Sequence, residues 1–548
     1  MSNYNTNIKP ATGTGAKDTN STTRASHPFD VEDGVVEAQA NGTLKRDLKN
    51  RHMQMIAIGG AIGAGLFVGS GGALYKGGPA ALVIGYIIVG VMLLMTTLAL
   101  AEMAVLFPVN GAFYTYIVRF VDPSWGFAMG WEYALAWLTV LPFELVAASI
   151  TIEFWRDDLS MGIWVTSFLV ALAIIQIFGV RGYGEVEFAL SMIKIIACIG
   201  FIILGIIINC GGVGEQGYLG AKYWYDPGAF KNSINGFCSV FVVAAFGFGG
   251  TEMVGLAAAE TADPRKSIPT ASKQVFWRIA IFYIVNLLIV GMILPSDDER
   301  LMGASGANTQ ASPFVLAIQD AGIKVLPSIF NAVITISVLS VANSCTYGST
   351  RTMQAMAEHG MAPKMLSYVD SKGRPLWCVF IQLGFGLLAF IGLAASSSTV
   401  FSWLLALSGL AFVFVWGSIC LAHIRMRTAW KRQGLPLGKI PYRTPFGVVG
   451  SYLGVFLNAV VLIATFYNAL YPSPHSTPTA INFFQSYLAF PIIVVLYLGY
   501  KIWTRDWSLF VPIEKMDLAT GVVLLDEEEP EETVTWKNFP LFMHKTLF

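Results

Sequence analysis

Charge is scarce in this chain of 548 residues. Asp, Glu, Lys and Arg make up only 13% of it, whereas soluble globular domains carry about 25%. The two signs also balance, with 35 basic and 35 acidic residues, so no charge excess points to a nucleic-acid or an acidic partner. A chain that is this poor in charge and 55% hydrophobic is typical of a protein that crosses a membrane many times.

Motifs for metal binding and catalysis are missing as well. The six cysteines form no C-x-x-C pair, and the six histidines form no H-E-x-x-H motif, which argues against a disulfide framework or a zinc site. No G-x-S-x-G nucleophile motif is present. One G-x-G-x-x-G match, at 212–217, falls in a predicted loop that opens no helix, so it does not indicate a nucleotide site. The sequence therefore predicts no enzyme, no metal and no cofactor.

Long apolar runs dominate what is present. A membrane-spanning helix needs about 20 mostly apolar residues. Twelve stretches meet this condition, at approximately 52–75, 79–106, 125–151, 161–180, 186–209, 235–260, 276–295, 327–350, 376–395, 400–423, 449–471 and 486–504. We therefore expect an all-α integral membrane protein with twelve transmembrane helices.

Two polar tails flank the apolar region. We expect residues 1–50 to form a disordered tail, residues 51–505 to form the membrane domain, and residues 506–548 to form a second tail. An even number of spans places both tails on one side of the membrane. The loops expected on that side hold most of the Lys and Arg residues, and such loops face the cytoplasm. Both termini are therefore predicted to be cytoplasmic.

Glycines interrupt the first apolar run. Residues 56–67 contain Gly59, Gly60, Gly63 and Gly65, and each glycine costs a helix interior about 1 kcal/mol relative to alanine. Unwound backbone in a membrane is tolerated only where it is buried in protein or lines a cavity. The alternative interpretation is close packing of helices through small residues.

A second glycine-rich stretch lies at 246–255, within the sixth apolar run. The first and sixth runs are corresponding members of two five-helix halves, and paired interrupted spans in matching positions mark the binding site of many secondary transporters. Exposed N–H groups at the first break would attract a carboxylate, and freed carbonyls at the second would accept an ammonium group. This pairing favours a site for a zwitterion.

Three ionisable residues fall well inside apolar runs: Lys194, Glu252 and Glu144. An ionised side chain at the bilayer centre costs several kcal/mol by most estimates, so these residues are candidates for proton coupling, and Glu252 also for substrate binding. The alternatives are snorkelling for Lys194 and purely structural hydrogen bonding for the carboxylates. Glu102 and Glu132 lie nearer the predicted span ends, where a structural role is favoured.

Several motifs resemble the fungal amino acid permeases of the amino acid–polyamine–organocation superfamily, and the match runs from about residue 44 to about residue 518. They include the stretches at 48–67, 104–111, 249–255, 259–269, 343–351 and 403–409. The resemblance implies a leucine-transporter-like fold, in which residues 52–209 and 235–423 form inverted five-helix repeats and residues 449–504 add two further helices.

The same resemblance implies where the substrate binds. The carboxylate site would fall on Ile62, Gly63, Ala64 and Gly65, and the ammonium site on carbonyls of Ala245, Phe246 and Phe248. In relatives the aromatic at the Phe246 position closes the pocket, the carboxylate at the Glu252 position responds to pH, and the lysine matching Lys194 replaces sodium. Glu132 departs from the family pattern, which usually has Asn there.

The implied function is proton-coupled uptake of L-amino acids at the plasma membrane, and the chain looks most like the general, broad-specificity branch. A narrower basic-amino-acid or proline permease is an alternative. A sensor that binds amino acids without transport is another, although sensors of this family carry longer N-terminal tails. Lys9 and Lys17 in the N-terminal tail are candidate sites for ubiquitin ligase machinery.

Overall fold

The computed structural model describes residues 46–156, 158–214, 217–301, 312–393, 397–471 and 479–525. Most of the expected N-terminal tail, with Lys9 and Lys17, lies outside the described residues, as do residues 526–548.

Helices account for the regular structure of the described residues, which contain no β-strand. The main helices in chain order are α1 Asn50–Gly59, α2 Ser70–Leu106, α3 Phe113–Phe120, α4 Pro123–Glu153, α5 Met161–Ile177, α6 Gly179–Asn209, α7 Ser233–Phe248, α8 Met253–Leu256, α9 Pro264–Trp277, α10 Asn286–Ile293, α11 Pro313–Asp320, α12 Leu326–Glu358, α13 Leu376–Gly386, α14 Ser397–Arg432, α15 Gly447–Leu470, α16 Ala480–Tyr487 and α17 Ala489–Thr504. Shorter π-helical turns (Gly65–Gly69, Trp224–Gly228 and Arg278–Val285) and 3-10 turns (Ala257–Glu260, Lys364–Ser367, Leu387–Leu393, Leu437–Lys439 and Ile513–Lys515) extend or connect them.

The described residues contain eight helices long and apolar enough to cross a membrane, and three shorter apolar helices. One of the eight, Gly65–Leu106, holds two predicted spans, because the chain turns at Gly78, whose φ of 82° is not helical, before Pro79. The first of these two is the second half of the broken first span, which begins with α1. The eight long helices thus hold nine spans, and the three shorter helices bring the number to twelve. The prediction of an all-helical membrane protein with twelve spans is confirmed.

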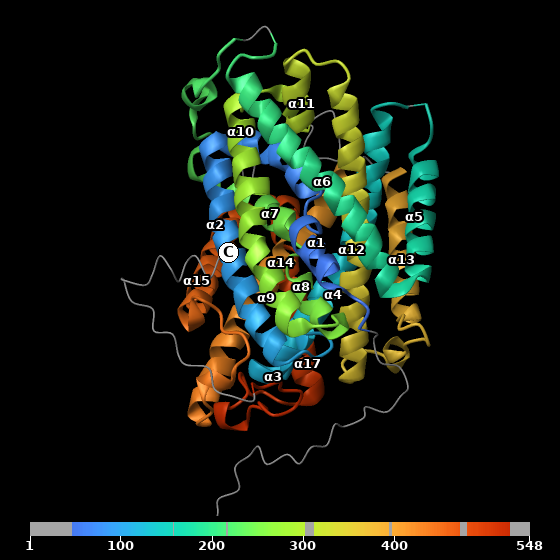
Figure 1. Cartoon of the computed structure of the whole chain (residues 1–548), viewed down its shortest axis with the longest axis vertical. Helices are drawn as coiled ribbons and strands as arrows, with labels where there is room; N and C mark the ends of the chain where they lie inside the picture. Colours follow the sequence, from blue (N-terminus) through green and yellow to red (C-terminus); the bar gives the residue numbers. More distant parts are fainter. Residues whose placement is uncertain are drawn as a thin grey trace, which may run out of the picture. The chain divides into compact units, whose positions relative to one another are not determined.

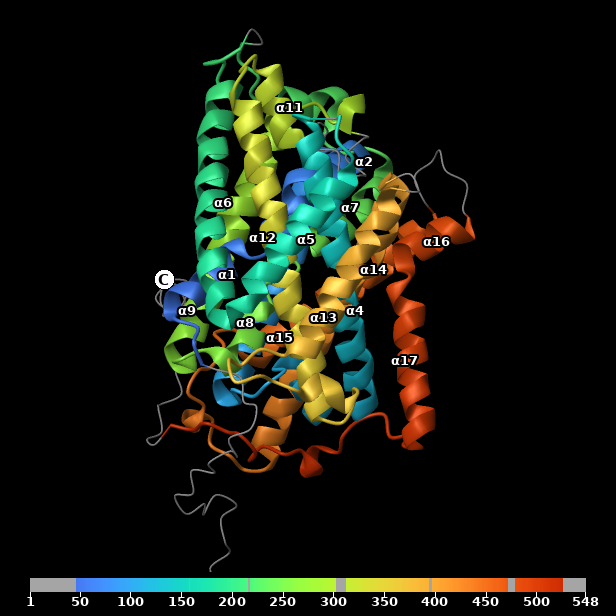
Figure 2. The same cartoon turned by 90° about the vertical axis from the view of Figure 1, so that its right-hand side faces the viewer.

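The helices pack around α4 and α2. The most extensive pairings join α4 to α12 and α2 to α7, and α14 packs on both α4 and α2. α1 lies against α6 and α9. The last two spans are peripheral, with α15 packed on α14 and α2, and α17 on α4; Figure 2 shows α17 at the edge of the bundle. The broken helices, α1 and α7 among them (Figure 1), are buried around their breaks, where Ile62, Ala245 and Phe248 are fully buried.

Residues 506–525, which we call the tail strap, run across the ends of several helices. The N–H of Val511 donates to the carbonyl of Val121 at 2.9 Å, and the N–H of Val523 donates to the carbonyl of Leu106 at 2.8 Å. Leu518 is only 3% exposed. We call this end of the bundle the tail side.

Candidate functional site

The first predicted span breaks where its glycines lie. α1 ends at Gly59, and a π-helical turn resumes at Gly65. The carbonyl of Gly63 accepts the N–H groups of Leu66 and Phe67 at 3.2 and 3.1 Å, which starts the second half of the helix. The N–H groups just before them belong to a helix start, where no intrahelical acceptor is available.

The sixth predicted span breaks in the same way. α7 ends at Phe248, and α8 begins only at Met253. Gly250 has a φ of 96°, a conformation that glycine adopts without the penalty a Cβ would bring. Glycine is therefore required by the turn itself at this position.

The two breaks touch backbone to backbone. A Cβ placed on Gly65 would lie 2.5 Å from the Cα of Gly247 and 2.8 Å from its nitrogen, which leaves no room for any side chain. A Cβ on Gly63 would lie 2.4 Å from a methyl group of Val341 on α12. The glycines thus allow the broken helices to approach closely.

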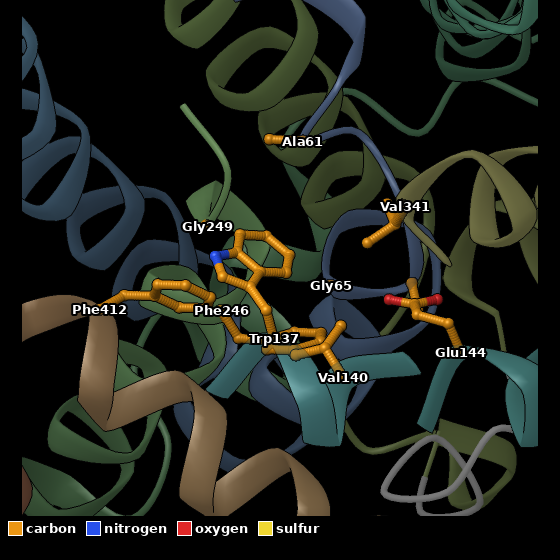
Figure 3. A pocket seen from close by; sticks show the side chains of 11 residues that line it. Ala61, Gly65, Trp137, Val140, Glu144, Phe246, Gly249, Val341 and Phe412 are labelled. Atoms are coloured by element: carbon orange, nitrogen blue, oxygen red, sulfur yellow. The ribbon is translucent and has the colours of Figure 1, made fainter. Parts of the chain in front are cut away.

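A small cavity lies beside this contact (Figure 3). Its lining comes from the first break, α4, the end of the first half of the sixth span, α12 and α14: Ala61, Gly63, Ala64, Gly65, Trp137, Val140, Glu144, Phe246, Gly249, Val341 and Phe412. Aromatic rings form much of the wall, with Trp137 5.0 Å from Phe412 between ring centroids. Phe246 packs edge-on against Phe143 at 5.0 Å.

The structure brings several predicted site residues to this cavity. Gly63, Ala64, Gly65, Phe246 and Glu144 line it. The remaining backbone candidates, Ile62, Ala245 and Phe248, are fully buried nearby and are absent from the described lining.

The two phenylalanines of the sixth span have different surroundings. The ring of Phe248 lies 4.4 Å from that of Tyr283 and 5.6 Å from that of Tyr86. Its carbonyl accepts the Thr251 hydroxyl at 2.7 Å. Of the two residues, Phe246 is therefore the one that lines the cavity.

Glu252 lies outside the described cavity lining and is surrounded by donors. Its Oε1 accepts the Tyr133 hydroxyl at 2.9 Å and the N–H of Gly250 at 3.2 Å. Its Oε2 accepts the indole N–H of Trp416 at 3.1 Å. The carboxylate therefore ties α4 and α14 to the second break, next to the aromatic wall formed by Trp137 and Phe412.

Arg278 is a functional candidate that the sequence reasoning missed. It is fully buried, donates to the carbonyl of Ala57 at the end of α1 at 2.7 Å, and also donates to the Thr251 hydroxyl. It interacts electrostatically with Glu252. The guanidinium thus links the two broken helices and balances a buried carboxylate. An arginine in the predicted seventh span was the available signal.

Lys194 lies in a buried ionic cluster. Its ammonium is 3.6 Å from Oε1 of Glu187, and both side chains are fully buried. It also interacts electrostatically with Glu144 at the cavity. Glu187 was not among the predicted site residues, although it lies seven positions before Lys194 on the same helix, a spacing that repeats one helix face.

The two carboxylates expected to be structural are both fully buried. Glu102 lies 3.1 Å from His423 and 2.8 Å from Arg427 and accepts the N–H of Thr444 at 2.7 Å, as a structural carboxylate does. Glu132 differs, because neither of its oxygens has a hydrogen-bond partner among the described residues.

An all-helical bundle with two broken helices around a buried cavity is the architecture of a secondary transporter.

Comparisons with known proteins agree with this class. A family model for amino acid permeases matches residues 52–513. The general amino-acid permease GAP1 of Saccharomyces cerevisiae is 51% identical, over 96% of this chain and 91% of the relative. The cationic amino acid transporter 1 of Schizosaccharomyces pombe is 49% identical, over 92% of this chain and 87% of the relative. The chain belongs to the amino acid permease family, a family of transporters rather than enzymes.

A solved structure supports the fold independently. The manganese transporter of Eremococcus coleocola superposes with a TM-score of 0.55, covering 86% of this chain and 98% of the other, at 13% identity. At this identity the likeness shows the fold alone. The predicted leucine-transporter-like fold is confirmed.

Proposed function

We propose that this protein is a plasma-membrane permease that takes up L-amino acids with broad specificity, coupled to protons. The observation that carries the proposal is the backbone contact of Gly65 with Gly247 beside a buried cavity. N–H groups at a helix start attract a carboxylate, and carbonyls at a helix end attract an ammonium group. Both groups belong to the part that all amino acids share.

Broad specificity follows because the two breaks would recognise only the carboxylate and the ammonium group, which all amino acids share. The side chain of the substrate would face the apolar wall of Trp137, Val140 and Phe412, which offers contact area but few fixed polar groups. The name of the 51% identical relative, a general amino-acid permease, supports the same conclusion. We further propose that the tail side is cytoplasmic, because the basic loops predicted from the sequence lie there.

A competition assay tests this recognition. Uptake of one labelled amino acid is measured in permease-deficient yeast against the twenty amino acids, together with alaninamide and N-acetylalanine. We expect alanine to compete and both derivatives to fail, because each lacks one of the two charges. Competition by either derivative would show that the breaks do not bind the zwitterion.

A narrower preference for basic amino acids is the second candidate, favoured by one observation. Glu144 brings a carboxylate to the cavity, and its Oε2 has no hydrogen-bond partner among the described residues. An ionised Glu144 would select cationic side chains. Competition by lysine and arginine but not by neutral amino acids would establish this candidate in place of broad specificity.

Three further experiments test the remaining alternatives. Accumulation by the purified protein in liposomes excludes a sensor that binds without transport. Competition by proline alone would identify a proline permease.

Ubiquitin ligase action on Lys9 or Lys17 predicts that the double Lys→Arg variant stays longer at the cell surface.

A further inference from the structure

The buried cluster around Lys194 holds more negative than positive groups. Glu187 lies 3.6 Å from the ammonium, and Glu144 also interacts with it. All three side chains are at most 1% exposed. Two ionised carboxylates with one ammonium would leave a net negative charge in a water-poor interior, which costs several kcal/mol. One of the two carboxyl groups should therefore hold a proton.

Most other buried carboxylates in the described part of the chain have a basic partner each, and so no such surplus. These pairs are Glu260 with Arg351 at 2.9 Å, Asp122 with Lys501 at 3.1 Å and Glu102 with Arg427 at 2.8 Å. The cluster around Lys194 differs from these pairs in its surplus carboxyl group, Glu144, which lines the cavity.

Hydrogen bonds indicate which carboxyl group is charged. Oε1 and Oε2 of Glu187 lie 2.7 and 2.8 Å from the donating hydroxyl of Ser340 on α12, and Oε1 also accepts from Ser191 at 3.2 Å. Donors of this kind stabilise the ionised form. In contrast, Oε2 of Glu144 has no partner among the described residues. The charge therefore belongs on Glu187 and the proton on Glu144.

Other described groups face this cluster, among them the buried Cys198 thiol near Lys194 and the buried Cys345 thiol near Glu144. The Tyr183 hydroxyl, one turn earlier on α6, lies 3.3 Å from the hydroxyl of Ser344 on α12. From α1, the carbonyl of Met55 accepts the Ser191 hydroxyl at 3.4 Å. The nearby cation Arg351 pairs with Glu260, and the His52 ring lies 3.2 Å from Glu185. Lys194 is thus the cation with which Glu187 pairs.

We infer that Glu187 is the fixed counter-ion of Lys194, and that this pairing makes Glu144 the group that takes up and releases the transported proton. This inference rests on the proposed proton coupling and adds to it a positioning residue and a single proton carrier. A proton from outside binds the Glu144 carboxylate at the cavity and leaves to the other side when the bundle reopens. Lys194 stays charged throughout, because Glu187 always balances it.

The variant Glu187→Gln tests the inference. It removes the charge and keeps the size of the side chain, so Lys194 must take Glu144 as its counter-ion, and Glu144 can no longer hold the proton. In proteoliposomes, a gradient of one pH unit can drive accumulation about tenfold in the wild type; the variant should show no accumulation. Exchange of labelled for unlabelled amino acid should continue, since it needs no net proton movement. A merely structural role would impair both.

The controls separate the possible failures. Glu185→Gln, two positions away and paired with Arg51 at the surface, should keep accumulation intact, and Glu187→Asp should restore part of it. Gradient-driven accumulation by Glu187→Gln would overturn the inference while leaving the proposed function standing. Absence of accumulation in the wild type would overturn both.

A second variant covers the case in which Glu187→Gln does not fold. Ser340→Ala removes one donor to Glu187 without removing its charge, so Lys194 relies more on Glu144, which then holds its proton less tightly. Half-maximal uptake should move to lower pH. An unchanged or raised midpoint would contradict the inference.

Discussion

Glu252 shows how much a single residue depends on partners far away in the sequence. Its position in an apolar run made it a candidate for proton coupling and substrate binding. That prediction follows from the free-energy cost of a charge in a membrane alone. Its donors, Tyr133 and Trp416, and its cation, Arg278, come from three other helices. No pattern within one span encodes these pairings, because they arise from how the helices pack.

The variant Glu252→Gln should destabilise the protein. An amide presents an N–H group where the carboxylate accepts, so either Tyr133 or Trp416 would face another donor. Leaving a buried polar group unsatisfied costs about 1–3 kcal/mol, which a thermal unfolding measurement in detergent detects. Tyr133→Phe is the control, because it removes one donor without creating a clash and should cost less. Equal stability of Glu252→Gln and the wild type would contradict the hydrogen-bond arrangement.

At the scale of elements, the broken helices were predictable and their contact was not. Glycine content alone predicts that residues 56–67 and 246–255 form poor helices. The closeness of Gly65 to Gly247 depends on the rotation of each half-helix about its axis, and tertiary packing sets that rotation. For the same reason the sequence did not identify Trp137, Val341 and Phe412 as lining residues.

The variant Gly65→Ala should abolish uptake. Its Cβ would lie 2.5 Å from the Cα of Gly247, and backbone cannot move aside as a flexible side chain can, so the two breaks must separate. Uptake of labelled amino acid and surface expression should be measured together, with expression retained. Gly200→Ala is the matched control, because a Cβ on Gly200 in α6 has no atom within 4 Å. Normal uptake by Gly65→Ala would show that the close contact is not needed.

At the scale of the whole molecule, the tail strap is the part that the sequence predicted least. Residues 506–525 were assigned to a tail, yet they hydrogen-bond to Val121, Leu106 and Lys439. Arg119 and Arg265 donate to strap carbonyls at 2.8 and 3.1 Å. These bonds join segments from the starts and ends of different spans, so the strap holds the tail side of the bundle together.

The variant Leu518→Ala should lower the stability of the whole protein. Leu518 is 3% exposed, and truncation of a buried leucine costs about 2–5 kcal/mol. The matched control is Leu509→Ala in the same strap, where the side chain is 69% exposed and little should change. Thermal unfolding in detergent measures both. Equal midpoints for the two variants would show that the strap does not stabilise the bundle.

Transport by the purified wild-type protein tests the central claim most directly. Proteoliposomes receive a labelled amino acid with an imposed pH gradient, acidic outside, and the accumulation ratio is measured with and without an uncoupler. A proton-coupled permease should accumulate the amino acid above its external concentration and lose this accumulation when the uncoupler is added. Uptake that only equilibrates, or that ignores the uncoupler, would contradict the account.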